Sequence, residues 1–253
     1  MTYLYKPNIL FVLLILVAYS AHSQEVVKVG LAHFPPYIEA REAKVSGLAI
    51  DMLKLMNQHQ DTYKFVPVRT TASTRHREFS AGRHDMSLFD NLSWGWNNLD
   101  VEASNEYLSG GEVYIARAKP ERDESYFSNF KNKKMIGVQG YHYAFAGFNA
   151  DPEYLRKTFK MELTQSNIGS IKMIVAGNRG DIAVVTKAFL SKYLNEHPED
   201  RNKLLVSQKL DQEYHFVSVI RKGIKPTARE LNDLLQQLEN NGSLPLLWKT
   251  ITH

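Results

Sequence analysis

The sequence predicts an α/β fold with mainly parallel sheets. Segments typical of buried strands alternate along the chain with segments whose apolar residues recur every three to four positions. Such alternation is typical of parallel strands that are connected by helices. A charged connector at residues 119–124 interrupts the pattern, which then restarts, so the strands and helices fall into two groups.

The first strand is predicted at residues 26–31, where the run is almost entirely apolar. Pro35 and Pro36 must end this strand, which leaves Tyr37 where the chain emerges from the sheet. In open α/β sheets, ligands bind at that place. A helix follows, with one apolar face made of Ala49, Met52, Leu53 and Met56.

Three more strands are predicted before the connector or at its edge. Residues 63–68 are rich in β-forming side chains, and residues 85–89 form a short apolar run. The third strand covers residues 112–118 and ends at Pro120.

Beyond the connector, a strand is predicted at residues 134–138 and a helix begins with Asp151 as its cap and Pro152 in its first turn. A second helix ends at Gly177, and its apolar stripe is Ile168, Ile171 and Val175. A buried strand at residues 181–185 then leads into a helix through Leu194.

The last third of the chain contains one strand and one strongly amphipathic helix. The strand is predicted at residues 214–220, and Thr227 and Glu230 have the spacing of a capping box at the helix start. The helix ends at residues 240–242, Asn-Asn-Gly, and its apolar face is Leu231, Leu234, Leu235 and Leu238.

Residues 1–23 have the pattern of a secretory signal peptide. One charge, Lys6, precedes an apolar run at residues 9–17, and small residues follow up to Ser23. The alternative is a retained membrane anchor, but the run is much shorter than the roughly 20 residues that a membrane span needs. We therefore expect an exported protein that is not inserted in the membrane after cleavage.

Composition narrows the compartment and the kind of partner. The chain has no cysteine, so disulfides, thiolate chemistry and lipid attachment through a lipobox are excluded. An exported protein without a lipid anchor stays near the cell only behind a second membrane, which indicates a periplasm. Loss of Lys6 lowers the formal net charge from +4 to +3, and basic residues do not cluster, so nucleic acid is not an expected partner. Scattered histidines without ligand spacing predict no metal site, and we expect no cofactor.

The opening of the mature region resembles that of the family 3 periplasmic solute-binding proteins. The shared features are the first strand, the turn Phe34-Pro35-Pro36-Tyr37 and the Gly47-x-x-x-Asp51 helix start. The resemblance continues in order over nearly the whole mature chain, up to residues 232–248. It implies a two-lobed type II periplasmic binding protein fold, in which segments like 113–119 and 215–222 cross between the lobes. On this mapping, lobe 1 comprises residues 24–116 and 219–253, and lobe 2 comprises residues 117–218.

The resemblance also shows where this chain departs from amino-acid receptors. Those receptors hold the ligand carboxylate with an Arg that follows the strand beginning here at Asp85, and they hold the ammonium with an Asp that ends a lobe 2 strand. This chain has Trp96 and Thr186 at the corresponding positions. Because Lys or a neutral residue does not replace a bidentate Arg, we expect a ligand other than a standard α-amino acid held in the usual way.

The predicted cleft is aromatic and mostly neutral. Aromatic side chains there would stack on a planar, sugar-like or cationic ligand, and Asp90 would accept from an amine or a hydroxyl. Residues 139–143 are expected to begin a helix whose N–H groups face the cleft. The alternatives are that the tryptophans are packing residues and that Asp90 caps a turn. The predicted ligand-binding residues are Phe34, Tyr37, Asp90, Asn91, Trp94, Trp96, Gln139, Tyr141 and Thr186.

The resemblance implies a monomeric periplasmic receptor that closes around a small polar solute and delivers it to an inner-membrane ABC permease, without catalysis. One alternative is a periplasmic dehydratase on the same fold, with Asp90, Glu102 or Glu106 as its acid or base. Another is a soluble ligand sensor for a membrane kinase or cyclase.

Overall fold

The computed structural model describes residues 23–41 and 44–251. The predicted signal peptide therefore lies outside the described residues, except for Ser23. In the two described ranges, no helix combines the length and the apolar character that crossing a membrane requires.

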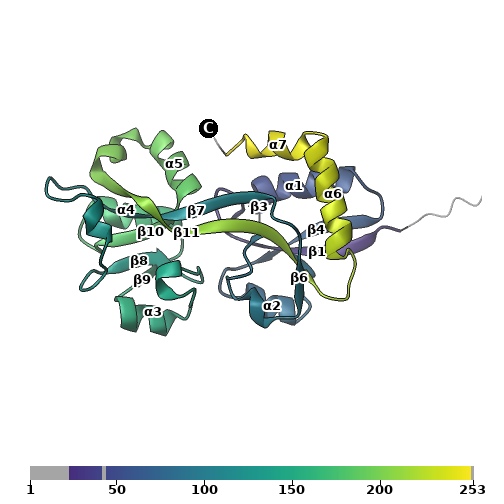
Figure 1. Ribbon diagram of the computed structural model, residues 1–253, viewed down its shortest axis with the longest axis horizontal. Helices are drawn as coiled ribbons and strands as arrows, with labels where there is room; N and C mark the ends of the chain where they lie inside the picture. Colours follow the sequence, from purple (N-terminus) through teal and green to yellow (C-terminus); the bar gives the residue numbers. More distant parts are fainter. Residues whose placement is uncertain (1–22, 42–43, 252–253) are drawn as a thin grey trace, which may run out of the picture.

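Two α/β lobes lie next to each other, and two long strands run between them (Figure 1). Lobe 1 has the strand order β4-β1-β5-β11, and β6 also pairs with β11. Its strands are β1 (Glu25–Ala32), β4 (Tyr63–Thr70), β5 (Met86–Asp90) and β6 (Val101–Ala103), with a small hairpin of β2 (Glu39–Arg41) and β3 (Lys44–Ser46). Its helices are α1 (Leu48–Gln58), α2 (Arg75–Ser80), α6 (Ala228–Asn240) and α7 (Ser243–Trp248).

Lobe 2 continues the same path in the order β7-β10-β8-β9. Its strands are β8 (Met135–Val138), β9 (Glu162–Thr164) and β10 (Ile182–Thr186). One face of this sheet packs on α4 (Asn167–Ala176) and α5 (Lys187–Glu196), and the other packs on α3 (Pro152–Phe159). Successive strand residues place apolar side chains on both faces of the sheet, as expected of a sheet that is covered by helices on both sides.

The two crossing strands are β7 (Leu108–Arg117) and β11 (Leu204–Arg221), which pair antiparallel with each other. Residues 217–220 of β11 also pair with β5 of lobe 1, and residues 112–116 of β7 pair with β10 of lobe 2. The strands connected by helices are parallel, namely β1 with β4 and β5, and β8 with β9 and β10. The predicted α/β class with two crossings is confirmed, while the lobe bounds at residues 116 and 218 stay a prediction.

Local sequence signals that were predicted at helix ends are present. Thr227 and Glu230 form the capping box of α6, the Asp151 side chain accepts from the Tyr154 N–H at the start of α3, and Gly177 ends α4 in the left-handed region. The predicted apolar faces of α1 and α6 are buried in lobe 1.

The helix start predicted at residues 139–143 is wrong. The Gln139 N–H donates to the Thr164 carbonyl and so continues the pairing of β8 with β9, and Gly140 has φ of 82°. A residue in that left-handed region cannot belong to a right-handed helix. The chain instead forms a loop that leads into a single 3-10 turn, Ala144–Ala146.

Candidate functional site

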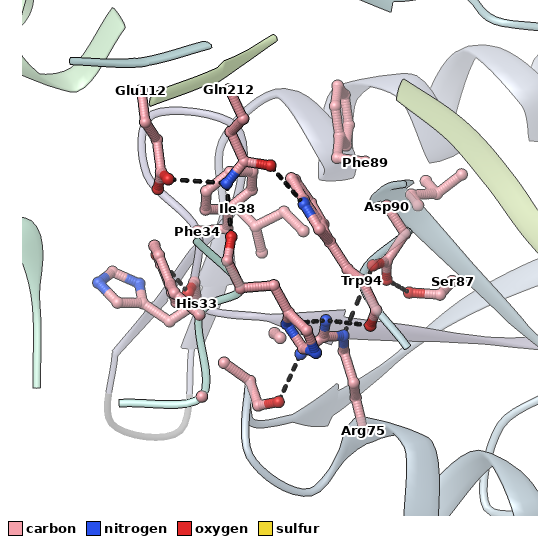
Figure 2. Close-up of a pocket in the computed structure, with 16 residues that line it drawn as sticks. His33, Phe34, Ile38, Arg75, Ser87, Phe89, Asp90, Trp94, Glu112 and Gln212 are labelled. Atoms are coloured by element: carbon pink, nitrogen blue, oxygen red, sulfur yellow. Dashed lines mark hydrogen bonds and ion pairs between the residues drawn. The ribbon is translucent and has the colours of Figure 1, made fainter. Parts of the chain in front are cut away.

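A small cavity lies where the two lobes meet at the crossing strands (Figure 2). Lobe 1 contributes the loop after β1, the start of α2 and the end of β5, lobe 2 contributes the loop after β8, and β7 and β11 contribute one side chain each. The residues that line it are Ala32, His33, Phe34, Ile38, Ala72, Arg75, Ser87, Leu88, Phe89, Asp90, Trp94, Glu112, Gly140, Tyr141, His142 and Gln212.

The cavity has a volume of about 40 Å³ in this conformation. One water molecule needs about 10–15 Å³ of such space, so only a few waters fit. A solute of amino-acid size therefore enters only when the lobes separate and the aromatic side chains between them part.

Aromatic rings from both lobes fill most of the space around the cavity. The Phe34 ring of lobe 1 meets the Trp94 ring at 5.6 Å and the Tyr141 ring of lobe 2 at 5.3 Å, both edge to face. The Tyr141 hydroxyl also donates to the His33 carbonyl at 3.3 Å. Such ring pairs contribute about 0.5–1.5 kcal/mol each beyond the area that they bury. They hold the two lobes against each other.

Gln212 on β11 links three parts of the site. Its Oε1 accepts from Trp94 Nε1 at 2.8 Å, and its Nε2 donates to Glu112 Oε2 at 2.8 Å and to the His142 carbonyl. Figure 2 shows these three bonds meeting at one amide. Gln212 and Glu112 lie opposite each other in the pairing of β11 with β7, so strand register brings them together.

Glu112 is a buried carboxylate with only 1% of its surface exposed. Burial and the nearby Asp211 carboxylate raise the pKa of Glu112 to about 8, and hydrogen bonds from Gln212 and Tyr214 oppose this rise. Within the described part of the chain, Glu112 forms no ion pair. It is an acid that burial keeps mostly protonated at neutral pH.

Arg75 and Asp90 form a buried ion pair on the lobe 1 side. Arg75 Nε lies 3.5 Å from Asp90 Oδ1, and the Ser87 hydroxyl donates to Asp90 Oδ2 at 2.7 Å. The other guanidinium nitrogens donate to the Ala72 and Trp94 carbonyls. The guanidinium is therefore occupied by protein acceptors, and the pair carries no net charge.

Two histidines lie beside this pair and are neutral at physiological pH. His142 Nδ1 is 3.5 Å from an Arg75 Nη, and burial, then the charges of Arg75 and His76, lower the pKa of His142 to about 2. Burial and Arg75 lower the pKa of His76 to about 4. Neither histidine supplies a positive charge to the cavity.

Of the nine predicted binding residues, four line the cavity: Phe34, Asp90, Trp94 and Tyr141. Tyr37 lies deeper in lobe 1, where its ring stacks on Phe89 with centroids 5.5 Å apart. Asn91 is next to the cavity, but its side chain accepts from the backbone N–H and the hydroxyl of Ser93 and so fixes the turn after β5.

The other three lie outside the cavity lining. Trp96 is fully buried against His76 and Phe79, which is the packing role given above as its alternative. Gln139 meets the amide of Gln165 at 3.4 Å, and Thr186 is buried and accepts from Asn167 Nδ2 at 3.1 Å. A binding role for any of the nine residues stays a prediction.

Sequence reasoning missed Arg75, Glu112, His142 and Gln212. Arg75 was not considered because the expected Arg follows β5, whereas this one begins α2. Glu112 and Gln212 lie within long strands, and a polar residue at a buried strand position was the one available signal for them.

Comparison with known proteins gives structural likeness only. No family model and no curated protein sequence matches this chain. A mutant of the arginine-binding protein ArgBP from T. maritima superposes with a TM-score of 0.68 at 18% identity, covering 89% of this chain and 94% of that one. The substrate-binding protein of an amino acid ABC transporter gives a TM-score of 0.66 at 16% identity, with 90% and 99% covered. The periplasmic VFT2 domain of Bordetella pertussis BvgS gives 0.63 at 18% identity, with 89% and 93% covered.

These structures cover nearly the whole described chain and share its two-lobed architecture. Together with the strand order and the two crossings, they show that this chain has the two-lobed fold of the periplasmic binding proteins.

Proposed function

We propose that this protein captures a small polar solute between its two lobes in the periplasm and presents it to an inner-membrane ABC permease. The observation that carries the proposal is the cavity whose walls come from both lobes and from both crossing strands. A site divided in this way is complete only when the lobes are closed, which is how such proteins couple binding to a change of shape.

A ligand acts by stabilising the closed arrangement. The contacts between Phe34 and Tyr141, and between Trp94 and Gln212, join the lobes directly in this conformation. A solute between the lobes would replace part of these contacts and shift the population toward closure by its differential affinity for the closed state. The closed surface is what a permease would recognise.

The ligand is proposed to differ from a standard α-amino acid held by an Arg and an Asp. Neither Trp96 nor Thr186, the residues at the two clamp positions, lines the cavity. The guanidinium that does line it, Arg75, is ion-paired with Asp90. The similar structures that are named as arginine-binding or amino acid transport proteins support a binding role, and they leave the ligand class open.

A catalytic role is not proposed. Of the three carboxylates considered for it, Glu102 and Glu106 lie outside the cavity, where they accept from the Ala228 N–H at 3.4 Å and contact His215 at 3.0 Å. The third, Asp90, is held by Arg75 and Ser87. A soluble ligand sensor for a membrane kinase is the second candidate. A sensor would bind its ligand in the same way, but it would act on a membrane kinase instead of an ABC permease.

The remaining parts of the proposal rest on the sequence and on the family resemblance. Residues 1–23 direct export and are removed, no lipid is attached because the chain has no cysteine, and the mature protein acts as a monomer.

The proposal is tested by finding a solute that stabilises the protein. Small molecules released from gently purified mature protein are identified by mass spectrometry, and a metabolite library is screened by thermal unfolding. A ligand that is specific for the native state must raise Tm. At a ligand concentration of 100 times Kd, the free energy of unfolding rises by about 2.7 kcal/mol. Failure to find any such solute would overturn the proposal.

A pair of variants places the binding site. Tyr141→Ala removes a ring that lines the cavity and should abolish most of the ligand-induced rise in Tm. Tyr154→Ala removes a ring of the same lobe that is 37% exposed and outside the cavity, and it should leave the rise unchanged.

A further inference from the structure

We propose that the solute is a small organic cation, an amine or guanidine without a carboxylate, that pairs with Glu112 among the aromatic rings of the cavity. This inference rests on the proposed function and names its ligand class. It follows from the charges that line the cavity, from the aromatic rings around them and from the ion pair that already occupies the Arg75 guanidinium.

The ionisable groups of the lining leave one carboxylate without a cation. Arg75 and Asp90 neutralise each other, and His142 is neutral. His33 accepts a backbone N–H through Nδ1 at 3.2 Å. Among the described residues that line the cavity, Glu112 is the one carboxylate without a cation beside it, and it accepts from the neutral amide of Gln212. The cavity is thus complementary to one positive charge.

Burial makes this unpaired acid costly when it is ionised. A buried carboxylate without a partner either takes up a proton or gains a cation, and Glu112 has a pKa raised to about 8. A bound ammonium or guanidinium would stabilise the ionised form and complete the pair. Binding would then release the proton that Glu112 holds in the free protein.

Three aromatic rings surround the same space. Phe34 and Trp94 of lobe 1 line the cavity together with Glu112 (Figure 2), and Tyr141 of lobe 2 also lines it. A cation at an aromatic face gains about 0.5–2 kcal/mol, more when water is excluded. A neutral sugar would gain stacking, but it would leave Glu112 protonated and without a cation.

A ligand carboxylate finds no free partner. Among the described residues, Arg75 is the one Arg or Lys that lines the cavity, and its nitrogens contact Asp90 and the Ala72 and Trp94 carbonyls. An entering carboxylate would meet Glu112, a second acid, and would find no unpaired cation. The site therefore selects the amine over the corresponding amino acid.

The test compares ligands that differ only in the carboxylate. Mature protein is titrated calorimetrically at pH 7.5 with three pairs: agmatine and arginine, cadaverine and lysine, histamine and histidine. We expect at least one amine to bind at least tenfold more tightly than its parent amino acid. The measured heat of binding of that amine should differ between buffers of different ionisation enthalpy, because the buffer takes up the proton that is released.

Two matched variants assign the interaction to Glu112. Glu112→Gln keeps the shape and the bond to Gln212, and it should weaken amine binding at least tenfold. Glu213→Gln makes the same change on an exposed residue of β11 and should leave the affinity unchanged. Thermal unfolding confirms that both variants are folded.

Three results overturn the inference. They are amino acids that bind as tightly as their amines, an unchanged affinity in Glu112→Gln, and binding of a neutral or anionic solute while none of the amines binds. In each of these cases the solute-binding function stands. If neither the amines nor any solute from the metabolite library binds, the proposed function fails as well.

Discussion

Trp94 Nε1 donates to Gln212 Oε1 at 2.8 Å, so a side chain from the lobe 1 part of the cavity is hydrogen-bonded to a strand that crosses into lobe 2. The same amide donates to Glu112 and to the His142 carbonyl in the loop after β8. One glutamine therefore connects both lobes and both crossing strands.

Gln212→Leu should weaken the closed arrangement. The substitution leaves Trp94 Nε1 and the His142 carbonyl without their partner, which costs about 1–3 kcal/mol for each buried group. We expect the free energy of unfolding in urea to fall by about 2–4 kcal/mol. The radius of gyration from small-angle scattering should rise as the lobes separate. Gln208→Leu changes an exposed residue of the same strand and should alter neither quantity.

Arg75→Met should be strongly destabilising because it leaves Asp90 buried without its cation. Loss of one partner of a buried pair typically costs about 3–5 kcal/mol. Arg77→Met, on the exposed side of α2, should change stability by about 0.5 kcal/mol or less. The measurement is equilibrium unfolding in urea.

A double variant distinguishes the ion pair from simple loss of packing. Asp90→Asn removes the charge that Arg75→Met leaves unpaired and keeps an acceptor for Ser87. The double variant should therefore be more stable than the sum of the two single effects. Strict additivity would show that Arg75 acts on stability without Asp90.

Glu112→Gln should become more stabilising as pH rises. The folded pKa of about 8 is above the unfolded value of roughly 4.3, so between these values the folded state holds a proton that the unfolded chain has lost. Wild-type stability therefore loses up to about 1.4 kcal/mol per pH unit in this window through Glu112. The difference in free energy of unfolding between variant and wild type should grow from pH 5 to pH 8.

The groups that face Glu112 define the control for this experiment. They are Asp211, Tyr141, Tyr143 and Tyr214, and desolvation by burial raises the pKa of each. The tyrosines stay protonated over the whole range, and Asp211 is unchanged in the variant. A difference that is flat with pH would show that Glu112 is ionised in the folded protein at pH 5.

His76→Gln should remove part of the loss of folding stability that occurs as pH falls. The folded pKa of His76 is lowered to about 4, so below pH 6.5 the unfolded chain binds a proton that the folded state does not. Wild type then loses up to about 1.4 kcal/mol per pH unit through this residue as pH falls from 6.5 to 5. The variant has a constant packing loss against Trp96 but lacks this slope. His215→Gln, an exposed change, should not remove it.

Most helices and strands could be predicted from the sequence because short-range sequence signals determine where they begin and end. The capping box of α6 and the Asp151 cap of α3 depend on residues three positions apart or fewer, and both formed. At residues 139–143 the local signal was misleading, because the N–H of Gln139 continues sheet pairing with a strand more than 20 residues away. Pairing between such distant residues cannot be read from a short segment of the sequence.

The cavity was only partly predictable for a related reason. Phe34, Trp94 and Trp96 were all named because loops that follow strands tend to carry binding residues. Phe34 and Trp94 line the cavity, whereas the side chain of Trp96 is buried in lobe 1. Glu112 and Gln212 become neighbours only through the register of β7 and β11, which are about 100 residues apart. Strand register between such distant segments is a property of the assembled sheet.

Asp211 on β11 accepts from the N–H groups of Ala144 and Phe145, at 2.8 and 3.0 Å, and from the Tyr114 hydroxyl at 2.6 Å. The loop that carries Tyr141 and His142 is thereby fastened to the crossing strand. Because the chain contains no cysteine, one thiol introduced at exposed Glu153, in the first turn of α3 of the same lobe, would accept a single dye. Its emission would report the movement of the lobe that carries this loop, so the protein is suited to an optical readout of binding in real time.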